Sequence, residues 1–211
     1  TVQLAANGIT PWTPETPALY TLRVNVTANG TADTAEQRIG IRTIQVSSKT
    51  GLLLNGQPRT MKGGCIHHDL GILGAADHAA AERRRIRLMK ESGFDAIRAA
   101  HNPFGPAFLN ACDELGMLVV EEAFDEWVMG RTSFGLHVPF EQCWEKDLED
   151  MITRDYNHPC IVMWSTGNEV EERDGTADGF AWAKRLADKV RSLDASRPVS
   201  ATACALFSEY G

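Results

Sequence analysis

Basic residues are too few in this sequence to balance its acidic residues. Lys and Arg number 21 against 28 Asp and Glu, which gives a formal net charge of −7. This acidic excess argues against nucleic acid or an anionic membrane surface as the partner, because both attract basic proteins. No apolar run approaches the ~18 residues that a membrane-spanning helix needs. We therefore expect no nucleic-acid partner and no membrane partner.

Several short motifs are also missing. The sequence has no G-x-G-x-x-G or G-x-x-x-x-G-K-[ST] loop to hold phosphates and no G-x-S-x-G turn to present a nucleophilic serine. Its five cysteines are odd in number, show no C-x-x-C spacing and lie mostly in apolar segments. We expect buried free thiols rather than disulfides or a zinc site, which favours a reducing compartment such as the cytoplasm. The cysteines are Cys65, Cys112, Cys143, Cys160 and Cys204.

The first 48 residues have the alternating pattern of β-strands. Segments 18–28 and 35–46 alternate apolar and polar residues and flank a turn at Asn29-Gly30, which predicts a hairpin from an antiparallel sandwich. A lone hairpin is only marginally stable in water. We therefore interpret residues 1–48 as the end of a larger β-domain that begins before residue 1.

Strands and helices alternate from residue 51 onward. A second Asn-Gly hairpin covers 52–61, and Asp77 is the candidate N-cap of the first helix, which Gly93 ends. Predicted strands are 62–69, 94–101, 117–124, 160–166 and 198–205, and predicted helices are 78–92, 106–115, 139–156 and 179–194. This alternation predicts parallel βαβ units. A doubly wound sheet and a truncated (β/α)₈ barrel both fit five strands and four helices, and in either the functional residues follow the strands.

Polar and ionisable residues follow four successive predicted strands, and repetition of this kind indicates a site. They are His67-His68-Asp69, Arg98 with His101-Asn102, Glu121-Glu122 with Asp125-Glu126, and Asn168-Glu169. Carboxylates beside aromatic residues, here Trp127 and Trp164, suit glycoside hydrolysis. A metal-dependent amidohydrolase is the alternative from residue types alone. His67 and His68 are adjacent, however, so their side chains would point to opposite faces of a strand.

Two long stretches resemble the signatures of glycoside hydrolase family 2: "AIRAAHNPFGPAFLNACDELGMLVVEEAFDEW" (96–127) and "RDYNHPCIVMWSTGNE" (154–169). "CIHHDLGILGAA" (65–76) is similar to the β-galactosidase-type members. "TPWTPETPALYTL" (10–22) and "RIGIRTI" (38–44) resemble the end of the family's immunoglobulin-like sandwich. The resemblance implies an α/β chain that holds the N-terminal part of a (β/α)₈ barrel, about five strands in residues 49–211, after the C-terminal strands of that sandwich.

The resemblance also implies roles for site residues. Glu169 would be the general acid/base, and Asn168 would hydrogen-bond the sugar 2-hydroxyl. His101 and His67 would line the pocket, and Arg98 would orient carboxylates of the site. The apolar run before "GNE" would then break at Gly167 to present Asn168 and Glu169. A general acid must keep its proton near neutral pH, which calls for partial desolvation of its carboxyl group.

The sequence departs from the family pattern at Asp95, Asn102 and Tyr156, and two further departures concern the catalytic machinery. Some members hold magnesium with a glutamate, a histidine and the acid/base. Glu126 matches that glutamate, but Val128 replaces the histidine, so we expect no metal or cofactor at Glu126 and Glu169. The nucleophilic glutamate of the family follows strand seven of the barrel, which lies beyond residue 211. We therefore expect the 211 residues to be a fragment of a longer chain.

The resemblance predicts hydrolysis of terminal β-glycosidic bonds by a retaining two-carboxylate mechanism, with a β-galactoside or a related carbohydrate as substrate. The alternatives are β-glucuronidase-type or β-mannosidase-type specificity, or a non-catalytic scaffold that still binds sugar. Five barrel strands would leave two unpaired strand edges, which predicts that the chain forms homo-oligomers.

Overall fold

A five-stranded parallel sheet forms the centre of the protein. The computed structural model describes residues 8–174 and 177–202. The strand order is β10-β9-β8-β7-β6, and each neighbouring pair is parallel. The strands are β6 (Gly63–Ile66), β7 (Ala96–Ala99), β8 (Leu118–Glu122), β9 (Ile161–Asn168) and β10 (Val199–Thr202). The part of the fifth predicted strand after residue 202, with Cys204, lies outside the described residues.

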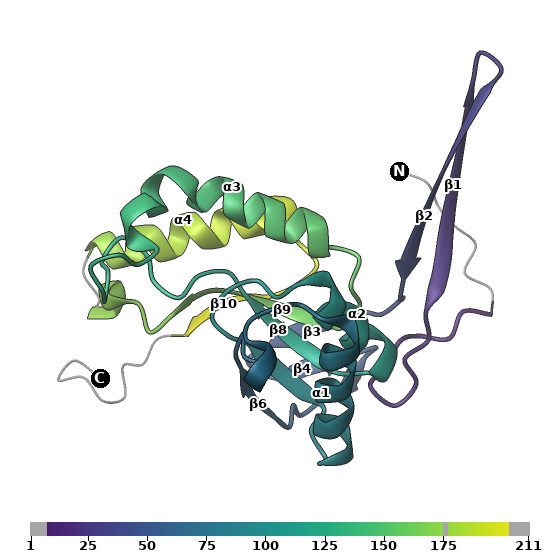
Figure 1. The fold of residues 1–211 in the computed structure, drawn as a ribbon, viewed down its shortest axis with the longest axis horizontal. Coiled ribbons are helices and arrows are strands. Elements are labelled where there is room, and N and C mark those ends of the chain that lie inside the picture. Colours follow the sequence, from purple (N-terminus) through teal and green to yellow (C-terminus); the bar gives the residue numbers. More distant parts are fainter. Residues whose placement is uncertain (1–7, 175–176, 203–211) are drawn as a thin grey trace.

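Four α-helices alternate with these strands, as predicted. They are α1 (Ala79–Glu91), α2 (Pro106–Leu115), α3 (His137–Asp155) and α4 (Ala177–Leu193), with 3-10 turns η1 (Gly71–Leu73) and η2 (Glu171–Asp174) in two of the loops. Helix α1 packs against α2, and α3 packs against α4 (Figure 1). No helix in the described parts of the chain combines the length and apolar character that crossing a membrane requires.

The hydrophobic core lies between the sheet and its helices. Leu118 and Ile161 on the central strands are fully buried, as are Phe108 and Leu109 of α2 and Leu148 of α3. Full burial of a large apolar side chain contributes roughly 1.5–3 kcal/mol. The near-continuous burial of β8 and β9 agrees with the prediction of parallel strands covered on both faces.

The N-terminal hairpin projects from this body as a long arm (Figure 1). Strands β1 (Tyr20–Ala28) and β2 (Thr31–Ile39) pair in antiparallel register around Asn29-Gly30, as predicted. The second strand is shorter than the predicted 35–46, because the chain leaves the hairpin at Gly40. A Cβ at Gly40 would lie 2.6 Å from Cγ of Pro159, so this close packing requires glycine.

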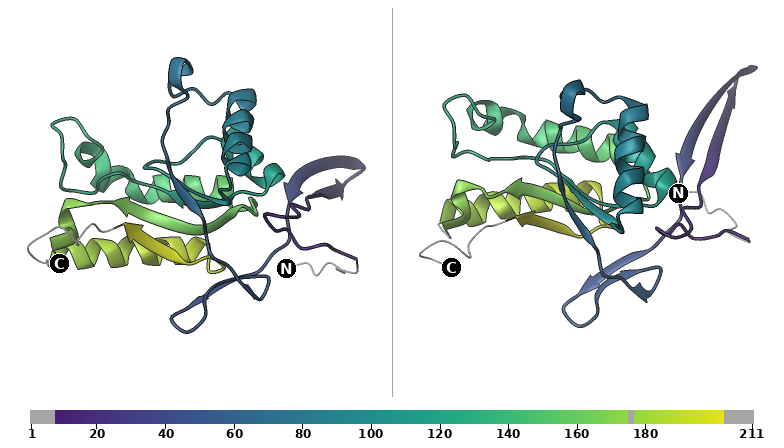
Figure 2. Two further views of the ribbon diagram at one scale, coloured as in Figure 1. Left: turned by 90° about the horizontal axis from the view of Figure 1, so that it is seen from below. Right: turned by 60° about the horizontal axis from the view of Figure 1, so that its bottom comes forward.

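A second antiparallel sheet comes between the arm and the barrel strands in sequence. It consists of β3 (Ile44–Ser47), β4 (Gly51–Leu54) and β5 (Gln57–Pro58), and its β4–β5 turn at Asn55-Gly56 is the second predicted hairpin. Figure 2 shows this sheet beside the start of β6, at the opposite end of that strand from η1. It therefore lies away from the carboxyl ends of the barrel strands.

The predicted cap of α1 is wrong by one residue. The N-cap position is His78, which makes no side-chain cap bond. Asp77 instead accepts a hydrogen bond from the backbone N–H of Ala107 in the first turn of α2, at 3.2 Å. The N-cap of α2 is Gly105, which has no side chain to satisfy the free N–H groups of that turn. Asp77 supplies the missing acceptor from a neighbouring loop.

Candidate active site

The register of the sheet places three polar side chains on one face at the carboxyl ends of the strands. Arg98 of β7 aligns with Val120 of β8, two residues before Glu122, and Glu122 aligns with Ser165 of β9. Residues two apart on a strand share a face. Arg98, Glu122 and Ser165 therefore point the same way, and all three are in hydrogen-bond contact.

Glu122 lies at the centre of the hydrogen-bond network of the site. Its carboxylate is fully buried and accepts hydrogen bonds from Arg98 Nε at 3.0 Å, Arg98 Nη2 at 2.7 Å and Ser165 Oγ at 2.7 Å. Burial by itself lowers the pKa of Arg98, but the hydrogen bonds and charge of Glu122 outweigh it and raise that pKa above its usual value. Glu122 and Arg98 therefore form an ion pair within the site.

The same carboxylate fixes the tautomer of His101. Nδ1 of His101 lies 2.8 Å from Oε1 of Glu122. An ionised carboxylate only accepts hydrogen bonds, so Nδ1 must carry the proton. Arg98 Nη2 also lies 3.3 Å from that nitrogen, but its two hydrogens already go to Glu122 and to Oδ1 of Asn168. The ring of His101 lies edge-on to that of His67, with centroids 4.9 Å apart.

Asn168 is held from both ends of its amide. Its Oδ1 accepts from Arg98 Nη2 at 2.7 Å, and its Nδ2 donates to Oδ1 of Asp125 at 2.9 Å. Asp125 is in turn paired with the guanidinium of Arg131. Because one neighbour can only donate and the other can only accept, the amide has one possible orientation. Asn168 is nearly fully buried, so this orientation is also shielded from water.

Glu126 organises the loop between β8 and α3 (residues 123–136). Its carboxylate accepts the backbone N–H of Arg131 at 2.9 Å and of His137 at 3.1 Å, and Nδ1 of His137 lies 3.1 Å away. Burial opposes ionisation here, but these N–H groups lower the pKa of Glu126 below its usual value. The donor set does not fit the magnesium site of the family, because both carboxylate oxygens of Glu126 already bond to this loop and Val128 supplies no ligand.

The break after β9 falls two residues later than predicted, at Glu169 instead of Gly167. The strand includes Gly167 and Asn168, and the chain turns at Glu169, whose φ is 45°. This left-handed conformation is disfavoured for a residue with a Cβ and recurs at active sites. Gly167 is required for another reason: a Cβ there would lie 2.7 Å from Nε1 of Trp127.

Two sequence expectations about the site are not met by the described residues. Glu169 is exposed rather than partly desolvated. The mouth of a complete barrel is built from the loops of eight strands, whereas five are described here.

Trp127 and Trp164 do not form a stacking surface for a sugar, because both side chains are buried. Their indole N–H groups donate hydrogen bonds to Thr166 O and to Asp194 Oδ2, respectively.

Two of the strand-end residues lie apart from this network. Glu121 is fully buried on the other face of β8, where one oxygen accepts the N–H of Phe104 at 2.7 Å and the other has no partner. His68 stacks on the ring of Phe104, with centroids 4.0 Å apart. The structure therefore brings together Arg98, His101, Glu122, Asp125 and Asn168, with His67 against His101.

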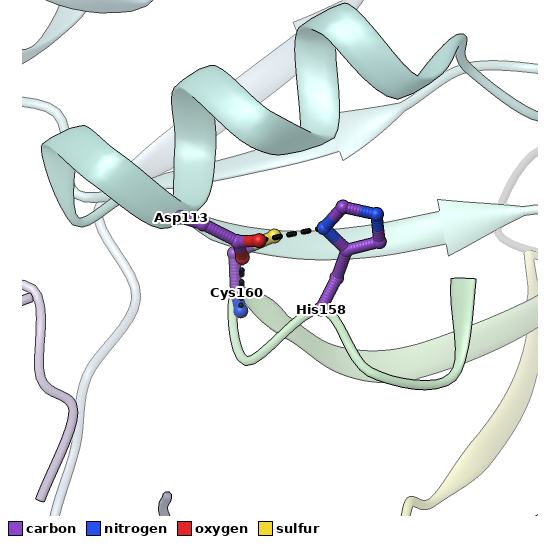
Figure 3. A group of neighbouring side chains, drawn as sticks. All are labelled: Asp113, His158 and Cys160. Carbon is purple, nitrogen blue, oxygen red and sulfur yellow. Dashed lines mark hydrogen bonds and ion pairs between the residues drawn. The ribbon is translucent and has the colours of Figure 1, made fainter. Parts of the chain in front are cut away.

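A second cluster, Asp113, His158 and Cys160, offers three potential metal-ligand atoms within 4.8 Å of one another (Figure 3). Oδ2 of Asp113 is hydrogen-bonded to Nδ1 of His158 at 2.6 Å, and Oδ1 accepts the N–H of Cys160 at 3.0 Å. Burial raises the pKa of the Cys160 thiol well above its usual range, which disfavours the thiolate that a metal requires. The cluster is a structural link between α2 and the start of β9.

The cysteines follow the prediction only in part. Cys112 and Cys160 are buried free thiols and Cys143 is half-buried, but Cys65 is exposed on β6. That strand lies at an edge of the described sheet and has a single neighbour.

The roles of Ser165 and Asp125 were missed at the sequence level. Ser165 lies within an apolar run, and its position opposite Glu122 depends on the register between two strands 40 residues apart in sequence. Alternation within β8 alone could have separated Glu122 from Glu121, because adjacent strand residues face opposite sides.

Comparison with known proteins agrees with this fold. Residues 44–207 match the model of the TIM barrel domain of glycosyl hydrolases family 2, and residues 2–42 match a further family 2 domain. The five-stranded parallel sheet therefore belongs to a TIM barrel domain. The chain belongs to glycosyl hydrolase family 2.

Relatives within the family differ in their named activities. A β-galactosidase of Bacteroides ovatus is 37% identical over 95% of this chain, and a putative β-glucuronidase of Formosa agariphila is 35% identical over 88%. A family 2 member of known structure from Bacteroides cellulosilyticus is 42% identical over 92% of the chain, with a TM-score of 0.89. The chain spans 27%, 18% and 25% of the lengths of these three proteins, respectively.

Proposed function

We propose that these residues form part of a retaining β-glycosidase that acts on terminal β-galactosides, and that they carry the general acid/base half of its site. The observation that carries the proposal is the network in which Glu122 and Arg98 hold His101 and Asn168 immediately before Glu169. The similarity to a β-galactosidase at 37% identity supports the choice of sugar.

Glu169 protonates the glycosidic oxygen as the bond to C1 breaks, and a second carboxylate attacks C1. Asn168 contacts the sugar 2-hydroxyl, and His67 and His101 line the pocket. Glu122 does not serve as the nucleophile, because it is fully buried and its oxygens accept bonds from Arg98, His101 and Ser165. The nucleophile of the proposed mechanism is therefore a carboxylate other than Glu122.

The proposed mechanism uses no metal. Glu126, the residue that matches a magnesium ligand of the family, uses its carboxylate to accept N–H groups of its own loop. Activity that survives dialysis against a chelator would support this part of the proposal, and activity restored only by added magnesium would contradict it.

The test is Glu169→Gln in the polypeptide that carries the complete barrel. We expect kcat to fall by roughly 10²–10⁴ for glycosides with poor leaving groups, the usual contribution of general acid catalysis. Activated aryl β-galactosides need less protonation and should lose less in the glycosylation step. The matched control is Glu149→Gln, an exposed residue of α3 that should leave the rate unchanged.

Equal losses on both substrate types would contradict the acid assignment, and an inverted anomeric product would contradict the retaining mechanism. Aryl β-glucuronides and β-mannosides tested in parallel decide the sugar. A preference for either would replace the β-galactoside assignment and leave the role of Glu169 intact.

A further inference from the structure

We propose that Asp125 is a positioning residue for Asn168, and that through it the loop of residues 123–136 sets the orientation of the amide that contacts the sugar. The inference rests on the proposed function, because Asn168 matters for turnover only if a sugar is the ligand. It adds a residue outside the catalytic and substrate-contacting groups assigned above.

The geometry gives Asp125 a specific task. An asparagine amide can rotate by half a turn about its last bond and exchange its oxygen and nitrogen at little steric cost. Arg98 favours the orientation that points Oδ1 toward its guanidinium, at 2.7 Å. Asp125 accepts from Nδ2 at 2.9 Å and would repel the oxygen in the flipped state. The two charged neighbours therefore exclude the flip from opposite sides.

The bonds to Asp125 and Arg98 leave the amide of Asn168 with one hydrogen-bond donor and one acceptor position for a ligand. Nδ2 has a second hydrogen and Oδ1 has a second lone pair after the bonds to Asp125 and Arg98 are made. In the fixed orientation the free N–H and the free lone pair each have a set direction. A sugar 2-hydroxyl that approaches Asn168 thus meets one pattern of donor and acceptor instead of two.

Asp125 is itself held by its loop. The guanidinium of Arg131 pairs with the Asp125 carboxylate and donates to its backbone oxygen at 2.7 Å. The backbone N–H of Arg131 donates to Glu126, which also bonds His137 at the start of α3. The side chain of Asp125 is 43% exposed, so Asp125 is not a core residue. Its contact with Asn168 is therefore not needed to satisfy a buried carboxylate.

The experiment compares variants of the active, complete polypeptide on two substrates, an aryl β-galactoside and its 2-deoxy analogue. We expect Asp125→Ala to lower kcat/KM on the parent sugar roughly ten- to a hundredfold, as for loss of a hydrogen bond to a charged group. The loss should fall mainly on kcat, because the 2-hydroxyl contact strengthens in the transition state. The 2-deoxy substrate should change by less than roughly threefold, as expected where no contact is lost.

Three further variants separate positioning from loop stability. Asp125→Asn keeps an acceptor oxygen and should retain more activity than Asp125→Ala. Arg131→Ala disturbs the loop but leaves the Asp125–Asn168 bond, so it should lose less than Asp125→Ala. Asp125→Ala combined with Asn168→Ala should lose no more than Asn168→Ala alone, because both act through one contact. The matched control is Asp188→Ala, an exposed residue of α4.

Each outcome has one meaning. Additive losses in the double variant, or equal losses on both sugars, would overturn the positioning role while the glycosidase assignment stands. A loss for Arg131→Ala as large as for Asp125→Ala would overturn it in favour of loop stability alone. A wild-type protein that turns over no β-glycoside would overturn the proposed function, and the inference with it.

Discussion

Glu121 and Glu122 are neighbours in sequence, yet their side chains lie in different surroundings. The carboxylate of Glu122 makes hydrogen bonds with Arg98, His101 and Ser165. Glu121 faces the other side of β8. Burial, followed by the nearby charge of Asp155, raises its pKa well above the ordinary value of 4.5. Its second oxygen has no hydrogen-bond partner, which agrees with a neutral carboxyl group.

The raised pKa of Glu121 makes stability depend on pH. The folded protein holds this proton at pH values where the unfolded chain has released it, so unfolding is favoured as pH rises above about 4.5. The contribution is fully present below that value and is lost as pH rises toward the folded pKa. We expect Glu121→Gln to match the wild type in stability near pH 4 and to become progressively more stable than it toward neutral pH.

Unfolding midpoints of the complete polypeptide, measured across this pH range, check the prediction. The matched control is Glu149→Gln, which changes an exposed glutamate paired with Lys189. The unfolding midpoint of this variant should change with pH in the same way as that of the wild type. A difference between Glu121→Gln and the wild type that stays constant with pH would show that Glu121 is ionised in the folded state.

Individual residues were only partly predictable from the sequence. The residue types after each strand indicated a site, and Arg98, His101 and Asn168 meet there. Their partners depend on register, which single-sequence patterns do not specify: Ser165 faces Glu122 because β8 and β9 align with a shift between Val119 and Val120. The tryptophans were misjudged because an aromatic residue next to a strand end can equally belong to the core.

At the scale of elements, one carboxylate joins segments that are 45 residues apart in sequence. Asp113 on α2 holds the side chain of His158 and the backbone of Cys160, just before β9. The backbone oxygen of Asp113 also accepts from the indole of Trp12 at 2.9 Å. Helix α2, the N-terminal segment and the start of β9 therefore meet at this residue, at the end of the strand opposite to Asn168.

We expect Asp113→Ala to lower the free energy of unfolding by roughly 2–4 kcal/mol, because it leaves the buried N–H of Cys160 and the ring of His158 without their acceptor. Denaturant unfolding of the complete polypeptide measures this loss. Asp188→Ala removes an exposed aspartate of α4 and should change the free energy by less than about 0.5 kcal/mol. Similar small losses for both variants would contradict the linking role of Asp113.

Element order was the most predictable level of the fold. Helix α2 begins and ends where Pro106 and Gly116 indicate, because proline suits a first helical turn and Gly116 takes the left-handed φ of 72° after the last turn. Boundaries set by tertiary contacts were missed. The hairpin ends early because Gly40 packs on Pro159, and α1 lacks the cap of Asp77 because that side chain serves α2.

For the whole molecule, the described sheet has two edges. Strands β6 and β10 each have one neighbour, and an open pocket beside β6 is lined in part by Met61, Cys65 and Val120. Unpaired strands and open apolar surface favour association with another chain. We therefore expect residues 1–211, prepared alone, to form oligomers through the edge of β10.

Sedimentation of the purified 211 residues tests this expectation. Ala201→Lys places a charge on an exposed position of the β10 edge and should shift the population toward monomer. Ala181→Lys adds the same charge on an exposed position of α4 and should leave the population unchanged. A wild-type chain that sediments as a compact monomer with a cooperative unfolding transition would contradict the expectation.

The backbone of Glu169 has a consequence for how this protein can evolve. Its φ of 45° is a conformation that glycine adopts freely and glutamate adopts at a cost of roughly 1–2 kcal/mol. The backbone conformation therefore favours glycine at this position, and the acid/base role that we propose for Glu169 is a reason for selection to keep the side chain. Under that proposal, a descendant that no longer needs the activity would tend to acquire glycine at position 169, whereas one that still needs it would keep glutamate.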